Sequence, residues 1–482
     1  MTEERKQELA ELLEEAMEEV VIKSRSGDKL ISIDKYREDV QACRQAYRPD
    51  LSYLFHYHPE IKDDVVKSKL FDFIKEELAA YIRDDMPGYP ARIKPASWGI
   101  GEVGFSMGYS LDRFLEKILE LVIVRGAEVA ISNFDKCTRE TEGSFKKIIL
   151  LRGIELGLEN PEIELEQGRE LQVYDGIHLV ALPAVPTGYP NLPPYLFDDG
   201  WMTRLFGSHP MDFSRKTLIV IDCVVEPLFF RPEPFADIQK EISNPFQFEI
   251  QSAEFPDFDE DKFCQALSLS CNSAIQPVLE WDHIDEDEIF SMRGEGVVGG
   301  SNRIPPFDYR GAAHVSDTQI EEAKCLYKKL VALDPDVHKK LRIPIDRWIQ
   351  SKADRDTVDQ MIDLGIAFEA LYLLDIDETT ELSFRLRLRA AWYLGENEED
   401  RRRLMKEFRE IYDWRSKVVH TGKVPNKKKK TPFTPKEVEK FIKRAQELCQ
   451  ESIMKILNAE QFPDRDYWNS LVLGGEDEQA SS

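Results

Sequence analysis

The sequence lacks the cysteine spacing of a disulfide framework or a zinc site. Its seven cysteines are odd in number, are scattered over 482 residues and include no Cys-x-x-Cys pair. They are Cys43, Cys137, Cys223, Cys264, Cys271, Cys325 and Cys449. Such cysteines are typical of proteins kept in a reducing compartment, so we expect a cytoplasmic protein without structural disulfides.

The sequence also lacks a long hydrophobic run. A membrane-spanning helix needs about 18 consecutive apolar residues, whereas the best candidate, residues 119–124, is interrupted by Glu120 and ends at Arg125. Residues 1–20 combine acidic and apolar side chains at helical spacing, without the basic start of a signal peptide. We therefore expect neither an export signal nor a membrane partner.

Positive charge is scarce in the chain as a whole. There are 64 Lys and Arg against 90 Asp and Glu, a formal net charge of −26 at pH 7. Such a charge argues against nonspecific coating of nucleic acid or of an anionic membrane. One segment departs from the average, because fifteen Lys or Arg between Arg385 and Lys430 stand against seven acids, a local net charge of +8. This segment is a candidate contact for a polyanion, although its run Lys427–Lys430 is also compatible with a solvated loop.

Familiar catalytic, nucleotide and metal motifs are absent or incomplete. No Gly-x-Ser-x-Gly or P-loop sequence occurs. Residues 99–104 read Gly-Ile-Gly-Glu-Val-Gly, but no strand is expected before them, so we expect no nucleotide site there. His56 and His58 lie near acids without a third ligand at motif spacing, which favours a surface loop over a metal site. Residues 282–288 are interpreted as an acidic loop, and no cofactor is predicted.

Hydrophobic periodicity predicts an α+β protein of several domains. The length suffices for two to four domains, each with its own core. Residues 1–88 are expected to be a helical N-terminal region and residues 89–300 a mixed α/β region with antiparallel strands, followed by a Gly- and Pro-rich linker. Within the mixed region we expect a helix at 111–125 and strands near 148–150, 154–156, 163–165, 171–173, 178–182, 218–225 and 263–269.

Residues 316–458 are predicted to form an all-α bundle, followed by a tail at 459–482. Ser316 with Gln319 and Thr434 with Glu437 form capping boxes at the starts of the first and last helices. Helices are expected between them at 354–374, 384–394 and 398–419, and the short loops favour an up-and-down bundle.

The helix predicted at 398–419 carries the most informative side chains. Its core-facing stripe consists of Leu404, Phe408, Ile411 and Val418. One position of that stripe is filled by Arg415, and burying an unpaired guanidinium would cost several kcal/mol. Arg415 must therefore face a partner side chain, a second subunit or a ligand anion. His420 follows five residues later, about 140° away around an ideal helix, so the two converge only if the helix end unwinds or if two copies of the helix face each other.

Arginine beside histidine, without neighbouring carboxylate ligands, suits metal-free cleavage of a phosphodiester. The histidine can take the proton of the ribose 2′-hydroxyl or give one to the leaving oxygen, while the arginine binds the phosphate and its developing charge. Trp414 and Tyr412 are candidates for base stacking, although ordinary packing in the bundle is the simpler interpretation.

Residues 412–423, Tyr-Asp-Trp-Arg-Ser-Lys-Val-Val-His-Thr-Gly-Lys, resemble the Arg-x-x-x-x-His signature of HEPN domains, specifically of the Apea-like HEPN family. Residues 347–348 and 363–372 resemble the central helix of that family and residues 387–395 the next helix, so the resemblance covers about 316–458. Residues 162–165 and 176–179 resemble the segment that often precedes this domain.

The resemblance implies a helical bundle that forms a homodimer, in which two Arg-x-x-x-x-His helices meet in a cleft. It also implies a metal-independent endoribonuclease with RNA as its partner, of the kind used in toxin and antiviral defence systems. By motif position, Arg415 and His420 are the implied catalytic residues. The accessory or RNA-binding candidates are Ser416, Lys417, Arg389, Glu369 and Lys423. Ser416 stands where family members often have Asn, Asp or His.

Alternatives to this function stay open. The bundle can instead be a non-catalytic HEPN dimerisation or RNA-binding module of a regulatory complex, with Arg415 paired to an acid across the interface. An enzyme in the N-terminal region, with the bundle as scaffold, is a further class that no motif supports. In the preferred interpretation the N-terminal region senses a trigger protein or ligand, or restrains the nuclease.

Overall fold

The structure is a computed structural model of the chain. It describes residues 1–24, 26–27, 29–45, 57–77, 111–139, 143–157, 169–181, 217–225, 253–254, 258–283, 297–298, 312–353, 356–376, 381–425 and 432–473. The chain divides into two compact units. Unit 1 comprises Met1–Leu151, Leu158–Phe258 and Val278–Pro306, and unit 2 comprises Arg152–Gly157, Asp259–Pro277 and Phe307–Ser482.

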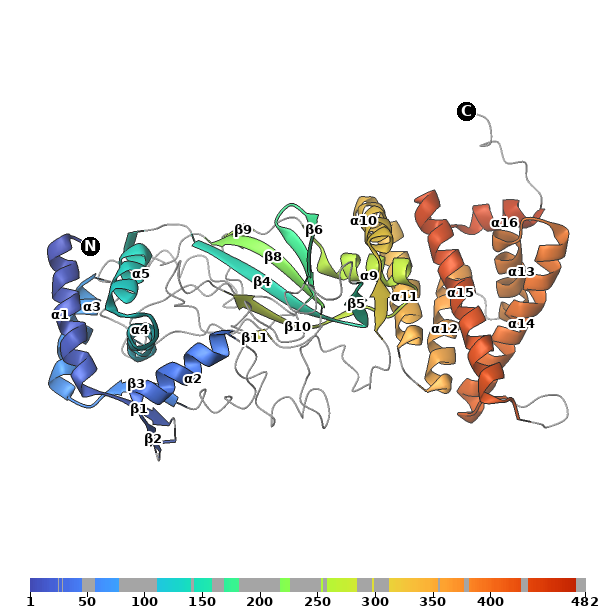
Figure 1. The fold of residues 1–482 in the computed structure, drawn as a ribbon. Helices are drawn as coiled ribbons and strands as arrows, with labels where there is room; N and C mark the ends of the chain where they lie inside the picture. Colours follow the sequence, from blue (N-terminus) through green and yellow to red (C-terminus); the bar gives the residue numbers. More distant parts are fainter. Residues whose placement is uncertain are drawn as a thin grey trace, which may run out of the picture. The chain divides into compact units, whose positions relative to one another are not determined.

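Unit 1 begins with helices around a small antiparallel sheet (Figure 1). Its elements are α1 (Glu3–Glu19), β1 (Val20–Ser24), β2 (Leu30–Ile31), α2 (Ile33–Gln45), β3 (Tyr57–Ile61) and α3 (Asp64–Glu77). The strands pair in the order β2-β1-β3. The predicted helical region therefore contains a sheet, because the β-branched run Val20-Val21-Ile22 directly after α1 favours an extended backbone.

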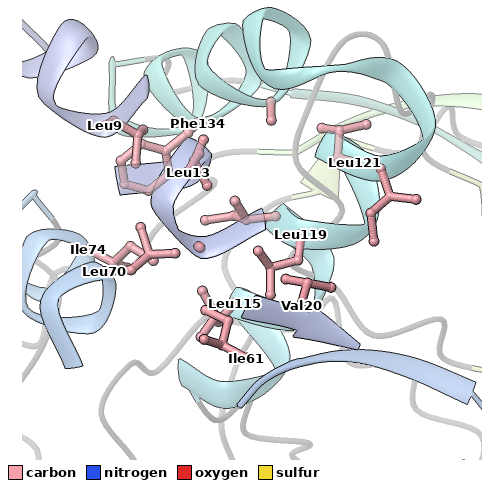
Figure 2. Close-up of a cluster of buried hydrophobic side chains, with 14 of the residues drawn as sticks. Leu9, Leu13, Val20, Ile61, Leu70, Ile74, Leu115, Leu119, Leu121 and Phe134 are labelled. Carbon is pink, nitrogen blue, oxygen red and sulfur yellow. The ribbon is translucent and has the colours of Figure 1, made fainter. Parts of the chain in front are cut away.

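The core of these helices extends past the predicted boundary at residue 88. The next helices, α4 (Leu111–Arg125) and α5 (Ala127–Arg139), pack against α1. Figure 2 shows Leu9 and Leu13 of α1 beside Phe134 of α5, and Leu115 of α4 beside Ile61 of β3, all buried in one cluster. The boundary thus divides elements that share a core, since the helix predicted at 111–125 buries its apolar stripe there.

A seven-stranded sheet forms the second part of unit 1. Its strands are β4 (Gly143–Arg152), β6 (Arg169–Tyr174), β7 (Ile177–Ala181), β8 (Thr217–Val225), β9 (Ala253–Glu254), β10 (Gln276–His283) and β11 (Val297–Val298). They pair in the order β11-β10-β4-β8-β7-β6, with β9 beside β8. The strand predicted at 218–225 is confirmed as β8, which is buried except at Asp222 among the side chains described there. The strand predicted at 163–165 and most of the predicted linker lie outside the described residues.

Unit 2 begins with a short parallel strand pair and with a helix whose residues were predicted to form a strand. The pair joins β5 (Ile154–Leu156) to β12 (Ala313–Val315). The strand predicted at 263–269 is wrong, because these residues belong to α9 (Glu260–Cys271). Every residue of that run is buried, the polar Gln265 and Ser268 included, and a short buried run does not distinguish a helix from a strand by its periodicity. The Asp259 side chain caps α9 by accepting a hydrogen bond from the Lys262 N–H at 2.9 Å.

The C-terminal helices include all those predicted, in the predicted order, and two that were not predicted, α11 and α16 (Figure 1). They are α10 (Asp317–Ala332), α11 (Pro335–Lys352), α12 (Thr357–Tyr372), α13 (Leu382–Leu394), α14 (Glu398–Thr421), α15 (Pro435–Ala459) and α16 (Arg465–Leu473). Both predicted capping boxes are confirmed, and α12 is central because it packs against α11, α13, α14 and α15. The segment predicted as a tail contains α16, whose Trp468 is buried against Tyr372 and Tyr393.

The protein is therefore mixed α and β with a C-terminal helical region, as predicted at that level of detail. In the part of the chain that the structure describes, no helix combines the length and the apolar character needed to cross a membrane.

Candidate active site on helix α14

Helix α14 holds Arg415 and His420 on one continuous stretch of α-helix. The helix begins at the cap residue Asn397, whose side chain accepts a hydrogen bond from the Asp400 N–H at 2.9 Å. It ends at Gly422, which has a left-handed φ of +64° and donates its N–H to the Val418 carbonyl at 2.8 Å. The helix is therefore intact beyond His420, and the unwinding that would bring the two side chains together does not occur.

Arg415 lies over α12 and is paired with Glu369. Its Nη2 is 3.0 Å from a carboxylate oxygen of Glu369. Its aliphatic stem crosses Gly365, one turn before Glu369, at a distance that leaves no room for a Cβ atom. Of the three partners considered for Arg415, the structure thus supplies a side chain of the same chain.

The guanidinium of Arg415 keeps donors available for a ligand. A guanidinium carries five N–H donors, and within the described residues Arg415 donates only from Nη2. The Arg415 side chain is 28% exposed and that of Glu369 is 31% exposed. A phosphate can therefore approach the partly exposed guanidinium while Glu369 fixes the orientation of the group.

His420 is an exposed side chain in the last helical turn. It makes no hydrogen bond or ion pair with the residues that the structure describes. An exposed imidazole that nothing holds in place has no evident packing role, so its loss should cost little stability. Five residues of ideal helix place it about 140° around the axis and roughly 7.5 Å along it from Arg415.

The accessory candidates fall into two groups. Lys417 and Lys423 are exposed and Ser416 is half-buried on the same helical segment or just after it. Arg389, in contrast, is a structural residue: Nη1 and Nη2 bond both carboxylate oxygens of Asp375 at 2.5 and 3.0 Å. Its side chain is only 11% exposed, so it does not offer its guanidinium to RNA.

The basic segment is partly neutralised by local ion pairs. On α14, Arg402 pairs with Glu398, Arg403 with Asp400 and Arg409 with Asp413. Glu369 and Asp375, which neutralise two further arginines, lie outside the segment. Because these two carboxylates are not included in the net charge of +8 counted for residues 385–430, the positive charge that the folded segment presents is smaller than +8. The Lys427–Lys430 run lies outside the described residues.

Trp414 belongs to the core and is not available for base stacking. Its ring is stacked on Phe441 with a centroid distance of 4.0 Å and also contacts Phe433 at 5.0 Å. Tyr412 is half-buried. The packing interpretation is thus confirmed for Trp414.

The other sequence candidates, which belong to unit 1, form no metal site among the described residues. Residues 99–104, His56 and residues 285–288 lie outside the described residues. His58 lies on β3, and no group of three or more His, Cys, Asp or Glu side chains among the described residues is placed to hold a metal ion.

Gly365 is the residue of this site that the sequence analysis did not identify. Glycine inside a helix is disfavoured by about 1 kcal/mol relative to alanine, so its presence in α12 was a usable signal for a close approach. The residue that approaches is Arg415. Gly365 makes room for its aliphatic stem, and Glu369 binds its guanidinium.

Known proteins give no independent assignment. The chain matches no protein-family model, and comparisons with curated proteins and with solved structures find no match either. A function for this chain must therefore come from the chemistry of its own side chains.

Proposed function

We propose that unit 2 is a metal-independent endoribonuclease of the HEPN type, acting at a site that Arg415 of one copy and His420 of a second copy complete together. The observation that carries the proposal is the intact end of α14. Because the helix does not unwind before His420, one chain keeps the two side chains on different faces. A second copy of α14 facing the first is the remaining way to join them.

The chemistry follows from the two side chains. The neutral His420 imidazole takes the proton of a ribose 2′-hydroxyl, and the 2′-oxygen attacks the adjacent phosphorus. The bond between phosphorus and the 5′-oxygen breaks, and the 5′-oxygen leaves with the proton that His420 took from the 2′-hydroxyl, which returns the imidazole to its neutral form. Arg415 binds the non-bridging oxygens, where negative charge develops in the transition state. The products are a 2′,3′-cyclic phosphate and a 5′-hydroxyl end, without water or metal as a reactant.

The proposal has a direct test in RNA cleavage by the full-length protein in the presence of EDTA. We expect 2′,3′-cyclic phosphate ends and loss of cleavage in His420→Ala, with an unchanged melting temperature because the side chain is exposed. His314→Ala is the matched control, since His314 is an exposed histidine of the same unit on β12. Cleavage that depends on Mg²⁺, or an equal loss in both variants, would contradict the proposal.

The second candidate is a non-catalytic HEPN dimerisation or RNA-binding module. The ion pair between Arg415 and Glu369 favours it, because this pair gives Arg415 a role without RNA. RNA binding that survives in an Arg415→Ala, His420→Ala double variant, without cleavage by the wild-type protein, would support this module. The first proposal also includes a defence or toxin role, a sensing role for the N-terminal region and a cytoplasmic location.

A further inference from the structure

The excess positive charge of the C-terminal helices is concentrated where α14 ends and α15 begins. Residues 413–443 contain ten Lys or Arg against three acids, a formal net charge of +7. The preceding residues of α14, 398–412, contain five of each sign, and the remaining residues of α15, 444–459, contain two of each sign. Four of the ten basic residues, Lys427–Lys430, lie outside the described residues. The charge therefore marks one end of these helices as a candidate surface for a polyanion.

Three of these lysines form a row on the first turns of α15. Lys436, Lys440 and Lys443 follow one another at spacings of four and three residues, which places them on one face of the helix. All three are exposed, and the buried stripe that contains Ile442 and Ala445 lies on the other side of α15. Because successive residues of a helix are 1.5 Å apart along its axis, the row is about 10.5 Å long, which is the rise of about three nucleotides in a stacked strand.

Two further lysines lie at the end of α14, close to His420. Lys417 precedes His420 by three residues, so the two side chains are neighbours on the helix surface. Lys423 follows directly after the cap residue Gly422. Both lysines are exposed, as His420 is. The last turn of α14 therefore presents the proposed catalytic histidine together with positive charge.

Contacts between α14 and α15 place the row at the same end of these helices as His420. Trp414 of α14 stacks on Phe441 of α15 at a centroid distance of 4.0 Å, and Glu407 of α14 pairs with Arg444 of α15 at 3.2 Å. The residue numbers rise along α14 while they fall along α15, so the two helices are antiparallel and the first turns of α15 lie beside the last turns of α14. We call the five residues the lysine surface: Lys417, Lys423, Lys436, Lys440 and Lys443.

The lysine surface differs from the exposed arginines nearer the start of α14 in its availability to a ligand. Arg402, Arg403 and Arg409 each pair with a carboxylate of the same helix. None of the five lysines makes an ion pair with a residue that the structure describes. The neighbouring rings of Trp414 and Phe441 are stacked on each other, so they do not offer a face to a base. The surface therefore presents unpaired ammonium groups, which bind phosphates as point charges.

We propose that the lysine surface binds the phosphate backbone of a single RNA strand and places its ribose groups at His420, whatever the base sequence. A single row of charges matches the single row of phosphates of one strand, and its position beside His420 favours a strand over an acidic protein. Phosphates are common to RNA and DNA and carry no sequence information. The surface therefore binds both kinds of strand, and only RNA offers a 2′-hydroxyl group to His420. The inference rests on the proposed function for the role of His420, whereas the binding of phosphates does not depend on cleavage.

Fluorescence anisotropy of the full-length His420→Ala protein tests the surface without cleavage of the probe. The probes are labelled oligouridylate and oligodeoxythymidylate of about 20 nucleotides. Each phosphate contact of a single strand contributes about −0.7 to the slope of log K against log salt, so five lysines predict a slope of about −3.5 between about 50 and 300 mM NaCl. The two probes should bind equally within about threefold, because the contacts are to phosphates.

Two triple variants, each made in the His420→Ala protein, make the test specific. The lysine variant replaces the row on α15: Lys436→Gln, Lys440→Gln and Lys443→Gln. The matched control removes the same charge from exposed arginines that are paired: Arg402→Gln, Arg403→Gln and Arg409→Gln. The lysine variant should reduce the magnitude of the salt slope by about 2 and weaken binding at least about tenfold, and the control should change neither. Both should keep the parent melting temperature, because every replaced side chain is exposed.

The inference is overturned if the two triple variants bind alike or if the affinities for RNA and DNA differ by more than about tenfold. It is also overturned if polyglutamate displaces the RNA probe as well as unlabelled oligodeoxythymidylate does, because the surface would then be a site for an acidic protein. Failure of the ribonuclease proposal gives a different result. The wild-type protein would then leave RNA uncut in EDTA, while the affinities and salt slopes remain those expected for the lysine surface.

Discussion

The close approach of Arg415 to Gly365 makes a Gly365→Ala substitution the sharpest perturbation of the candidate site. A Cβ atom at this position would lie 3.3 Å from both Cβ and Nε of Arg415 and closer still to its Cγ. The Arg415 stem must therefore leave its place over α12, and the guanidinium must leave Glu369. The change removes no polar group, so its effects report on the position of the arginine.

The two contributions to stability have opposite signs. Alanine stabilises the interior of a helix by about 1 kcal/mol relative to glycine. The overlap with Arg415 costs about 1–3 kcal/mol, and loss of the partly exposed ion pair with Glu369 costs about 0.5–1 kcal/mol. We therefore expect Gly365→Ala to destabilise the wild-type protein by about 0.5–3 kcal/mol. In an Arg415→Ala background the same substitution should stabilise the protein by about 1 kcal/mol, because only the higher helix propensity of alanine remains.

Hydrogen exchange of the amides of α12 measures this difference, since it reports the opening free energy of one element in a large protein. The four proteins are the wild type, both single variants and the double variant, and we expect a coupling of about 1.5–4 kcal/mol. RNA cleavage by Gly365→Ala should fall by about 10²-fold, as expected when a charge-stabilising donor is displaced. Equal stabilisation by Gly365→Ala in both backgrounds would refute the contact between Gly365 and Arg415.

Other substitutions test the remaining parts of the bundle. Arg389→Ala should lower the free energy of unfolding by about 3–5 kcal/mol, because it leaves the Asp375 carboxylate unpaired at a largely buried site; the urea midpoint measures this. Burial lowers the pKa of Lys352 from 10.5 to about 8, so the unfolded chain binds more protons than the folded chain between those values, and stability should rise with pH across this window. Lys352→Met should flatten that rise in urea midpoints taken at pH 7 and 9.5. Gly422→Ala should cost about 1 kcal/mol, because Gly422 has φ of +64°, and should increase hydrogen exchange in the last turn of α14.

The sequence was most informative where local rules decide the structure. The capping boxes at Ser316 and Thr434 and the β-branched run of β8 depend on residues within a few positions of one another, and each was correctly predicted. The stripe on α14 correctly required a partner for Arg415. It did not identify Glu369 as that partner, because the contact joins residues 46 positions apart and depends on how α12 and α14 cross.

The errors arise where burial hides periodicity. In α9 all residues from Phe263 to Leu269 are buried, the polar Gln265 and Ser268 included, so polarity does not mark an exposed face from which a helical period could be read. Helix α11 was not predicted from periodicity, because Pro344 in its interior resembles a break. Arg389 resembled an RNA-binding residue within a basic segment, and only the folded chain places it against Asp375.

The most direct test of the central claim mixes two inactive variants. In a symmetric dimer whose sites each join Arg415 of one copy to His420 of the other, an Arg415→Ala chain paired with a His420→Ala chain has one complete site. An equimolar mixture, after dissociation and reassociation, should therefore recover about a quarter of the wild-type rate of RNA cleavage in EDTA. Cleavage by the mixture that does not exceed the average of the two separate variants would contradict the shared site.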